Sequence, residues 1–185
     1  MYTDSQLNKS DWPFRLAILF FLTGLFLFGR HLDFDGFVHP DEPTKVYQIL
    51  QGKYNFHHPL LMLNSVRVFV EASGRDINYD FVMLAGRWSS AIFSASAIAL
   101  LVLATGRLHG KVIALASGFF LLSNPQLFDL AHYFKEDPSL VFGISVTLLS
   151  IIVYGEQKTP LAAAFMGAAA ALAFSAKYAG IIVFP

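Results

Sequence analysis

The sequence has no cysteine and few charged residues, and both shortages limit what the protein can be. Without cysteine there are no disulfides, thiol nucleophiles or thiolate metal sites. Charged residues make up 14% of the 185 residues, against about 25% in soluble domains, whereas 55% are hydrophobic and 19 are phenylalanine. This composition predicts an all-α membrane protein.

An excess of one charge is also lacking, because 13 acidic residues balance 13 basic ones. No basic surplus points to a nucleic-acid partner, and no acidic block points to a solvated tail. The expected surroundings are membrane lipids. Function must therefore come from individually placed residues.

Apolar runs predict a polytopic bundle of about five to six transmembrane helices. The first run, at about 14–29, is flanked by Trp12 and Arg15 as interfacial anchors. No small-residue cleavage site follows it, so a retained span is predicted rather than a signal peptide. Further spans are expected at about 81–105, 112–122, 138–154 and 160–176, with a sixth beginning at 178–185.

The first two spans are separated by a long polar loop. Inside it, residues 42–51 and 59–72 have helical periodicity and are predicted to form interfacial helices. Short loops favour a cytoplasmic N-terminus, but the basic residues of this long loop oppose that orientation. Because the chain stops inside an apolar segment, residues 1–185 are interpreted as one transmembrane domain, the N-terminal part of a longer module.

Two acidic pairs are the strongest local signals. Asp41 and Glu42 lie between two prolines after the first span, and Glu136 and Asp137 precede the fourth span. An even number of crossings separates the pairs, so they are predicted to face the same side. Each pair has a plain interpretation as helix caps. Together they could instead supply a general base and bind a divalent cation through carboxylate oxygens.

Histidines and two cations accompany the acids. The histidines on the same predicted side could bind metal or phosphate, but no two of them have the i, i+4 spacing of a helical zinc motif. Arg87 lies inside the second span, where a cation either binds a lipid phosphate or snorkels to the interface. Lys177, between the fifth and sixth spans, is a second candidate for anionic-lipid or donor-phosphate binding. The supporting histidines are His39, His57, His58 and His132.

In their order along the chain, these motifs resemble the start of a GT-C type glycosyltransferase. This membrane superfamily uses polyprenyl-phosphate sugars and includes protein O-mannosyltransferases and lipid A aminoarabinose transferases. The resemblance rests on His39-Pro40-Asp41-Glu42, residues 52–60, Gly86-Arg87-Trp88, Asn124-Pro125 with residues 131–137, and residues 177–185.

The resemblance implies a cytoplasmic N-terminus, an integral protein of the plasma or inner membrane, and an active site outside the cytoplasm. It implies an inverting transfer of sugar from a polyprenyl-phosphate donor to an unknown protein, lipid or glycan acceptor. Asp41 would activate the acceptor, with Glu42 assisting or orienting. Glu136 and Asp137 would complete the acidic site or, with Asp41, hold a divalent metal.

By the same analogy, Arg87 and Lys177 would neutralise the donor phosphate. The chemistry fits these roles, because a sugar phosphate already has a good leaving group and needs only a base for the acceptor and cations for the phosphate.

Two other functions remain open from the residues alone. A transporter or flippase would use the carboxylates to line a substrate path, although charges near the membrane midplane would suit transport better than these loop clusters. In a non-catalytic membrane scaffold, both acidic pairs would be caps and Arg87 would snorkel. Substituting Asp41 would then leave activity unchanged.

Overall fold

A computed structural model describes residues 11–34, 38–54 and 56–184, and the regular secondary structure in these ranges is helical, with no strand. The all-α class predicted from composition is therefore confirmed. The elements are α1 (Trp12–Phe28), α2 (Glu42–Gln51), α3 (Leu61–Ala72), α4 (Tyr79–His109), α5 (Lys111–Leu122), α6 (Pro125–His132), α7 (Asp137–Gln157), α8 (Pro160–Ala176) and the 3-10 helix η1 (Tyr178–Val183).

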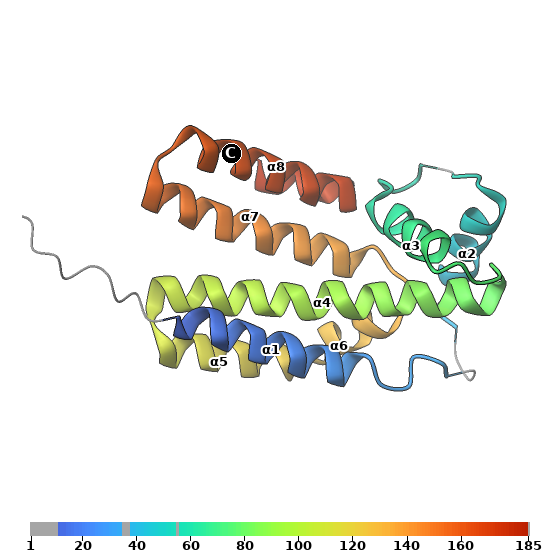
Figure 1. Ribbon diagram of the computed structural model, residues 1–185, viewed down its shortest axis with the longest axis horizontal. Coiled ribbons are helices and arrows are strands. Elements are labelled where there is room, and N and C mark those ends of the chain that lie inside the picture. Colours follow the sequence, from blue (N-terminus) through green and yellow to red (C-terminus); the bar gives the residue numbers. More distant parts are fainter. Residues whose placement is uncertain (1–10, 35–37, 55, 185) are drawn as a thin grey trace, which may run out of the picture.

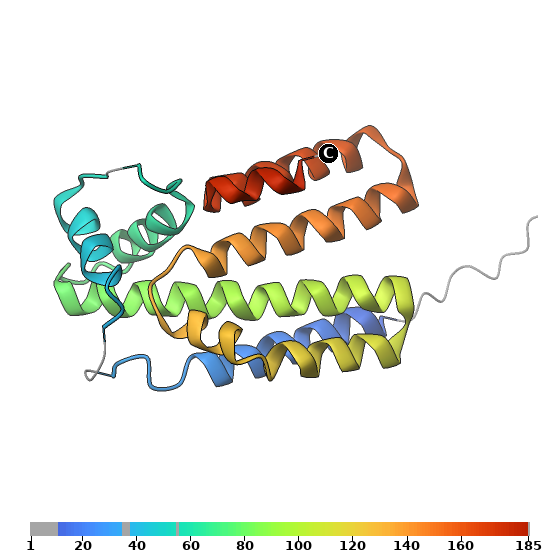
Figure 2. The same cartoon turned by 180° about the vertical axis from the view of Figure 1, so that it is seen from behind.

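The long helix α4 is the centre of the bundle (Figure 1). It packs against α1, α5 and α7, and α8 packs on the far side of α7. The small helices α2 and α3 lie beside the N-terminal end of α4, as both views show (Figures 1 and 2). The loop between α6 and α7 reaches the same end, so segments far apart in sequence meet there.

Small residues allow the long helices to approach closely. A Cβ atom on Gly24 of α1 would lie 3.3 Å from the Cβ of Ala95 in α4, and one on Gly143 of α7 would lie 2.6 Å from the Cα of Ala173 in α8. In a membrane, such contacts replace the hydrophobic effect as the source of helix association.

Two helices, α4 with 31 residues and α7 with 21, are long and apolar enough to cross a membrane. The pair α5 and α6 passes the same test together but is bent by 57° at the break, so it forms at most one broken span. Helices α1 and α8 are apolar but shorter. The structure thus contains two to three candidate spans among its described residues, and the count of five to six stays a prediction.

The loop helices have the amphipathic character that the sequence predicts. Helix α2 has the predicted bounds and ends at Gly52, whose φ of 64° is the left-handed conformation that suits glycine. Helix α3 buries Met62, Val66 and Val70, whereas Phe69 stays exposed. These helices cover the start of α4, and their location at a membrane surface stays a prediction.

The end of the described chain differs from the expected sixth span. Residues 178–183 form the 3-10 helix η1, which packs back against α8 and α7. Gly180 permits this return, because a Cβ there would overlap the backbone of Ala173. Pro185 lies outside the described residues.

Candidate active site

Glu42 joins the two acidic loops at the N-terminal end of α4. Its side chain is fully buried, and its two oxygens accept four hydrogen bonds. Arg87 donates from Nε at 2.9 Å and from Nη2 at 3.1 Å. The backbone N–H groups of His39 and Phe134 donate at 2.9 and 2.8 Å. The carboxylate therefore holds α2, α4 and the α6–α7 loop together.

Arg87 is buried as well, with 3% of its surface exposed. Besides pairing with Glu42, it donates from Nη1 to the carbonyl oxygens of Leu32 at 2.9 Å and Phe34 at 3.1 Å, and its guanidinium lies 4.3 Å from the centre of the Phe34 ring. These contacts fix the segment that follows α1. Arg87 therefore faces protein groups. Its role in binding the donor phosphate stays a prediction.

The second acidic pair is also bound to cations from other segments. Lys45 of α2 lies 3.3 Å from Glu136, and both side chains are less than a tenth exposed. Lys177, just after α8, donates to Asp137 at 2.9 Å, where both side chains are about 30% exposed. Glu136, the N-cap residue of α7, makes no side-chain cap hydrogen bond. The carboxylates of the pair instead connect loops across the end of the bundle.

Asp41 differs from the other three acids because 57% of its side chain is exposed. Although it precedes α2, it makes no side-chain cap hydrogen bond. Its Oδ2 lies 3.6 Å from Nδ1 of His39 and 3.9 Å from Nζ of Lys135. The capping interpretation therefore does not describe this side chain, which faces solvent beside two nitrogen groups.

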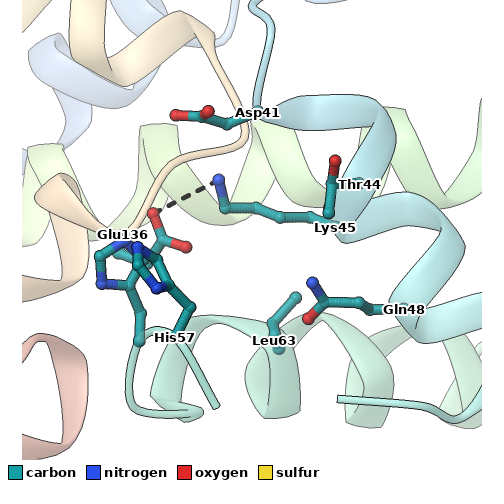
Figure 3. Close-up of a pocket in the computed structure, with 8 residues that line it drawn as sticks. Asp41, Thr44, Lys45, Gln48, His57, Leu63 and Glu136 are labelled. Atoms are coloured by element: carbon teal, nitrogen blue, oxygen red, sulfur yellow. Dashed lines mark ion pairs between the residues drawn. The ribbon is translucent and has the colours of Figure 1, made fainter. Parts of the chain in front are cut away.

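A polar pocket of about 180 Å³ opens beside Asp41 (Figure 3). The Lys45–Glu136 ion pair crosses it, and the side chains of Gln48 and His57 point toward it. The buried Oε1 of Gln48 has no hydrogen-bond partner among the described residues. The lining residues are Asp41, Thr44, Lys45, Gln48, His57, His58, Leu63 and Glu136.

Three of the four predicted histidines lie at this end of the bundle near the acids. His57 and His58 line the pocket with their ring centres 4.7 Å apart, and Nε2 of His39 lies 3.1 Å from Nζ of Lys135. His132 is different, because its Nδ1 lies 2.7 Å from the carbonyl oxygen of Phe128 in its own helix. Its contacts are therefore local to α6.

Tyr133 closes one side of the His39 ring, with 5.5 Å between the ring centres. Burial raises the pKa of the Tyr133 phenol, and the carboxylates of Asp129 and Glu42 act in the same direction. The phenol is therefore neutral at every pH at which an ordinary tyrosine is neutral. It acts as a hydrogen-bonding group rather than as a base.

A family comparison agrees with this architecture. The model of the dolichyl-phosphate-mannose-protein mannosyltransferase family matches residues 68–185, well over half of the chain. The chain belongs to this family. The resemblance to GT-C type mannosyltransferases is thus confirmed, and with its apolar helices the protein is an integral membrane glycosyltransferase. No curated protein and no solved structure matches the chain.

The family match covers one part of the site and leaves the other part outside it. Arg87, Glu136, Asp137 and Lys177 lie within the matched mannosyltransferase residues, whereas the first acidic loop with Asp41 precedes them. The contacts of Glu42 with Arg87 and Phe134 join the unmatched segment to the matched one. Buried hydrogen bonds therefore connect the first loop to the segment that matches the family.

A divalent metal at the acids of this mannosyltransferase chain stays a prediction. Within the described ranges, no group of three or more metal-binding side chains comes together. Glu136 and Asp137 each face a lysine, and a lysine ammonium occupies the space that a cation would need. We therefore assign no step to a metal ion.

Sequence reasoning did not single out several residues of the site, among them Lys45, Gln48 and Lys135. Lys45 and Gln48 are three residues apart on one face of α2, and the helical period together with the buried Val46 could have indicated that this face turns inward. Lys135 lies inside the motif of residues 131–137, where nothing distinguishes it from its neighbours. No local pattern reveals its contact with His39, because 96 residues separate them.

Proposed function

We propose that this mannosyltransferase-family protein transfers a sugar from a polyprenyl-phosphate donor to an acceptor hydroxyl, with Asp41 as the general base. One observation carries the proposal. Of the four acids in the two acidic pairs, Asp41 is the one that is largely exposed, and it borders the polar pocket, whereas Glu42, Glu136 and Asp137 each pair with a cation at 3.3 Å or less.

The transfer follows from these groups. The Asp41 carboxylate accepts the proton of the acceptor hydroxyl as its oxygen attacks the anomeric carbon of the donor sugar. The bond between that carbon and the phosphate oxygen breaks, and polyprenyl phosphate leaves with the bonding electrons. Attack opposite the leaving group inverts the anomeric centre. Cations near the departing oxygen stabilise its developing charge.

The pocket suits a sugar better than an apolar ligand. Its walls carry the hydroxyl of Thr44, the amide of Gln48 and the imidazole of His58, all of which hydrogen-bond to hydroxyl groups. We therefore assign this pocket to the transferred sugar, and the exposed carboxylate at its border to the acceptor.

The test is transfer of radiolabelled sugar by the full-length protein, expressed from its own gene and supplied with polyprenyl-phosphate donors in isolated membranes. Removing a general base costs about 100-fold or more in rate, so Asp41→Asn is expected to lose transfer to that extent at unchanged protein level. Asp76→Asn is the matched control, because Asp76 is an exposed acid in the same loop. Equal rates for Asp41→Asn and the control would remove Asp41 from the mechanism.

A further inference from the structure

Lys135 lies where the two loops meet. Its backbone N–H donates to Oγ of Ser90 at 3.4 Å, which anchors it to α4. Its Nζ lies 3.1 Å from Nε2 of His39 and 3.9 Å from Oδ2 of Asp41, and 18% of the side chain is exposed. An ammonium has three N–H donors, so a further hydrogen bond is open to it beyond these two neighbours.

The other cations around the site are committed to buried or half-buried acids. Arg87 pairs with the fully buried Glu42 and Lys45 with the nearly buried Glu136. Drawing either cation toward a ligand would leave a buried carboxylate unpaired, which is strongly unfavourable. Lys177 is held by Asp137 at 2.9 Å.

Lys135 faces no such penalty. Its carboxylate neighbour is the exposed Asp41, which water solvates when Lys135 turns away. His39 keeps the ammonium in place, because the imidazole ring is itself fixed against Tyr133 and the backbone N–H of His39 is bonded to Glu42. Lys135 is thus positioned by His39 and by its backbone bond to Ser90, and it can exchange its anionic neighbour.

We infer that Lys135, held by His39, binds the phosphate of the polyprenyl-phosphate sugar. The inference rests on the proposed function and adds a phosphate-binding residue to it. Because Asp41 both lines the pocket and neighbours Lys135, a sugar in the pocket has its base and this ammonium close together. When the bond from the anomeric carbon to the phosphate oxygen breaks, the ammonium stabilises the negative charge that remains on the phosphate.

The experiment measures phosphate-dependent lipid binding, which needs no turnover. The purified full-length protein in phosphatidylcholine nanodiscs receives polyprenyl phosphate, uncharged polyprenol or phosphatidylglycerol at equal mole fractions, and bound lipid is counted by native mass spectrometry. The variants are Lys135→Gln, Lys135→Arg and the control Lys53→Gln, an exposed lysine of the first loop.

Wild type and the control are expected to retain polyprenyl phosphate over polyprenol, Lys135→Gln to bind it at least tenfold more weakly, and Lys135→Arg to recover most of the binding. In transfer assays, Lys135→Gln should raise the KM for the donor. The inference is overturned if Lys135→Gln binds polyprenyl phosphate like wild type, or if phosphatidylglycerol binds equally well in a Lys135-dependent way, since the site would then be a general anionic-lipid site.

The role of Lys135 and the proposed function can be rejected separately. Unchanged lipid binding by Lys135→Gln, together with loss of transfer in Asp41→Asn, would reject the role of Lys135 and keep the proposed function. A wild-type protein that neither binds polyprenyl phosphate nor transfers sugar would reject both.

Discussion

The Glu42–Arg87 pair is the most buried ionic contact of the site, with side-chain exposures of 0% and 4%. A buried ion pair stabilises a fold little in comparison with apolar residues of the same volume, because both charges lose their water. Its value here is positional. Through Glu42 and Arg87, backbone groups of the segment after α1 and of the α6–α7 loop are fixed to α4.

Breaking this pair is predicted to destabilise the protein. Glu42→Gln leaves the Arg87 cation buried without a counter-charge, and Arg87→Met leaves the Glu42 carboxylate buried without one. Each substitution is expected to lower the free energy of unfolding by about 3–5 kcal/mol. The double variant should cost less than the sum of the two, because neither charge then remains. Thermal unfolding in detergent, followed for the single and double variants, measures the difference. Additive losses would show that the two side chains are not coupled.

Adjacent residues also show the limit of sequence reasoning at this scale. Asp41 and Glu42 were treated as one acidic pair, but successive helical positions point about 100° apart, so one side chain faces solvent and the other faces the core. The sequence indicates the motif and its chemistry. It could not indicate which acid meets Arg87, because that contact spans 45 residues.

At the scale of helices and loops, Gly86 decides how closely the α6–α7 loop approaches α4. The Phe134 ring is fully buried against Gly86, where a Cβ atom would overlap it. The same residue, Phe134, donates its backbone N–H to Glu42. The glycine therefore sets the position of the second acidic loop.

Gly86→Ala is predicted to displace Phe134 and lower both stability and sugar transfer. Overpacking of this kind costs typically about 1–3 kcal/mol. Adding Phe134→Leu should recover part of the loss, because the smaller side chain makes room for the methyl group. Gly167→Ala is the matched control, since a Cβ at Gly167 in α8 meets nothing within 4 Å. Similar losses for Gly86→Ala and Gly167→Ala would rule out the steric explanation.

Most helices could be predicted from the period of apolar residues and from prolines. Helix α2 has the predicted bounds, and α3, α4, α5, α7 and α8 begin within about two residues of the expected positions, because apolar runs and prolines such as Pro160 mark helix starts. Helix α6 and the 3-10 helix η1 were not predicted. Both are too short to give a clear apolar period, although Asn124 caps α6 and Pro125 stands in its first turn.

For the whole molecule, the question is which side of the membrane holds the site. The α2–α3 end of the bundle and the α7–α8 turn lie at opposite ends (Figure 1). The GT-C resemblance implies that the first of these lies outside the cytoplasm, and this orientation stays a prediction. The 185-residue sequence contains no cysteine, which makes single-cysteine labelling clean in this region.

Asp76→Cys, in the exposed loop before α4, is expected to react with a membrane-impermeant maleimide in intact cells. Lys158→Cys, at the exposed turn between α7 and α8, is expected to react only after the cells are permeabilised. The protein without either substitution gives the background. Labelling of both in intact cells, or the reverse pattern, would contradict the proposed orientation.

The bonds of Glu42 also have a consequence for biosynthesis. Glu42 is made 45 residues before Arg87 and 92 residues before Phe134. At translation speeds of about 5–20 residues per second, Phe134 follows Glu42 by about 5 to 18 seconds. Until then Glu42 lacks the Phe134 donor and the polar pocket lacks Glu136, so the pocket is complete only after the ribosome has synthesised the α6–α7 loop.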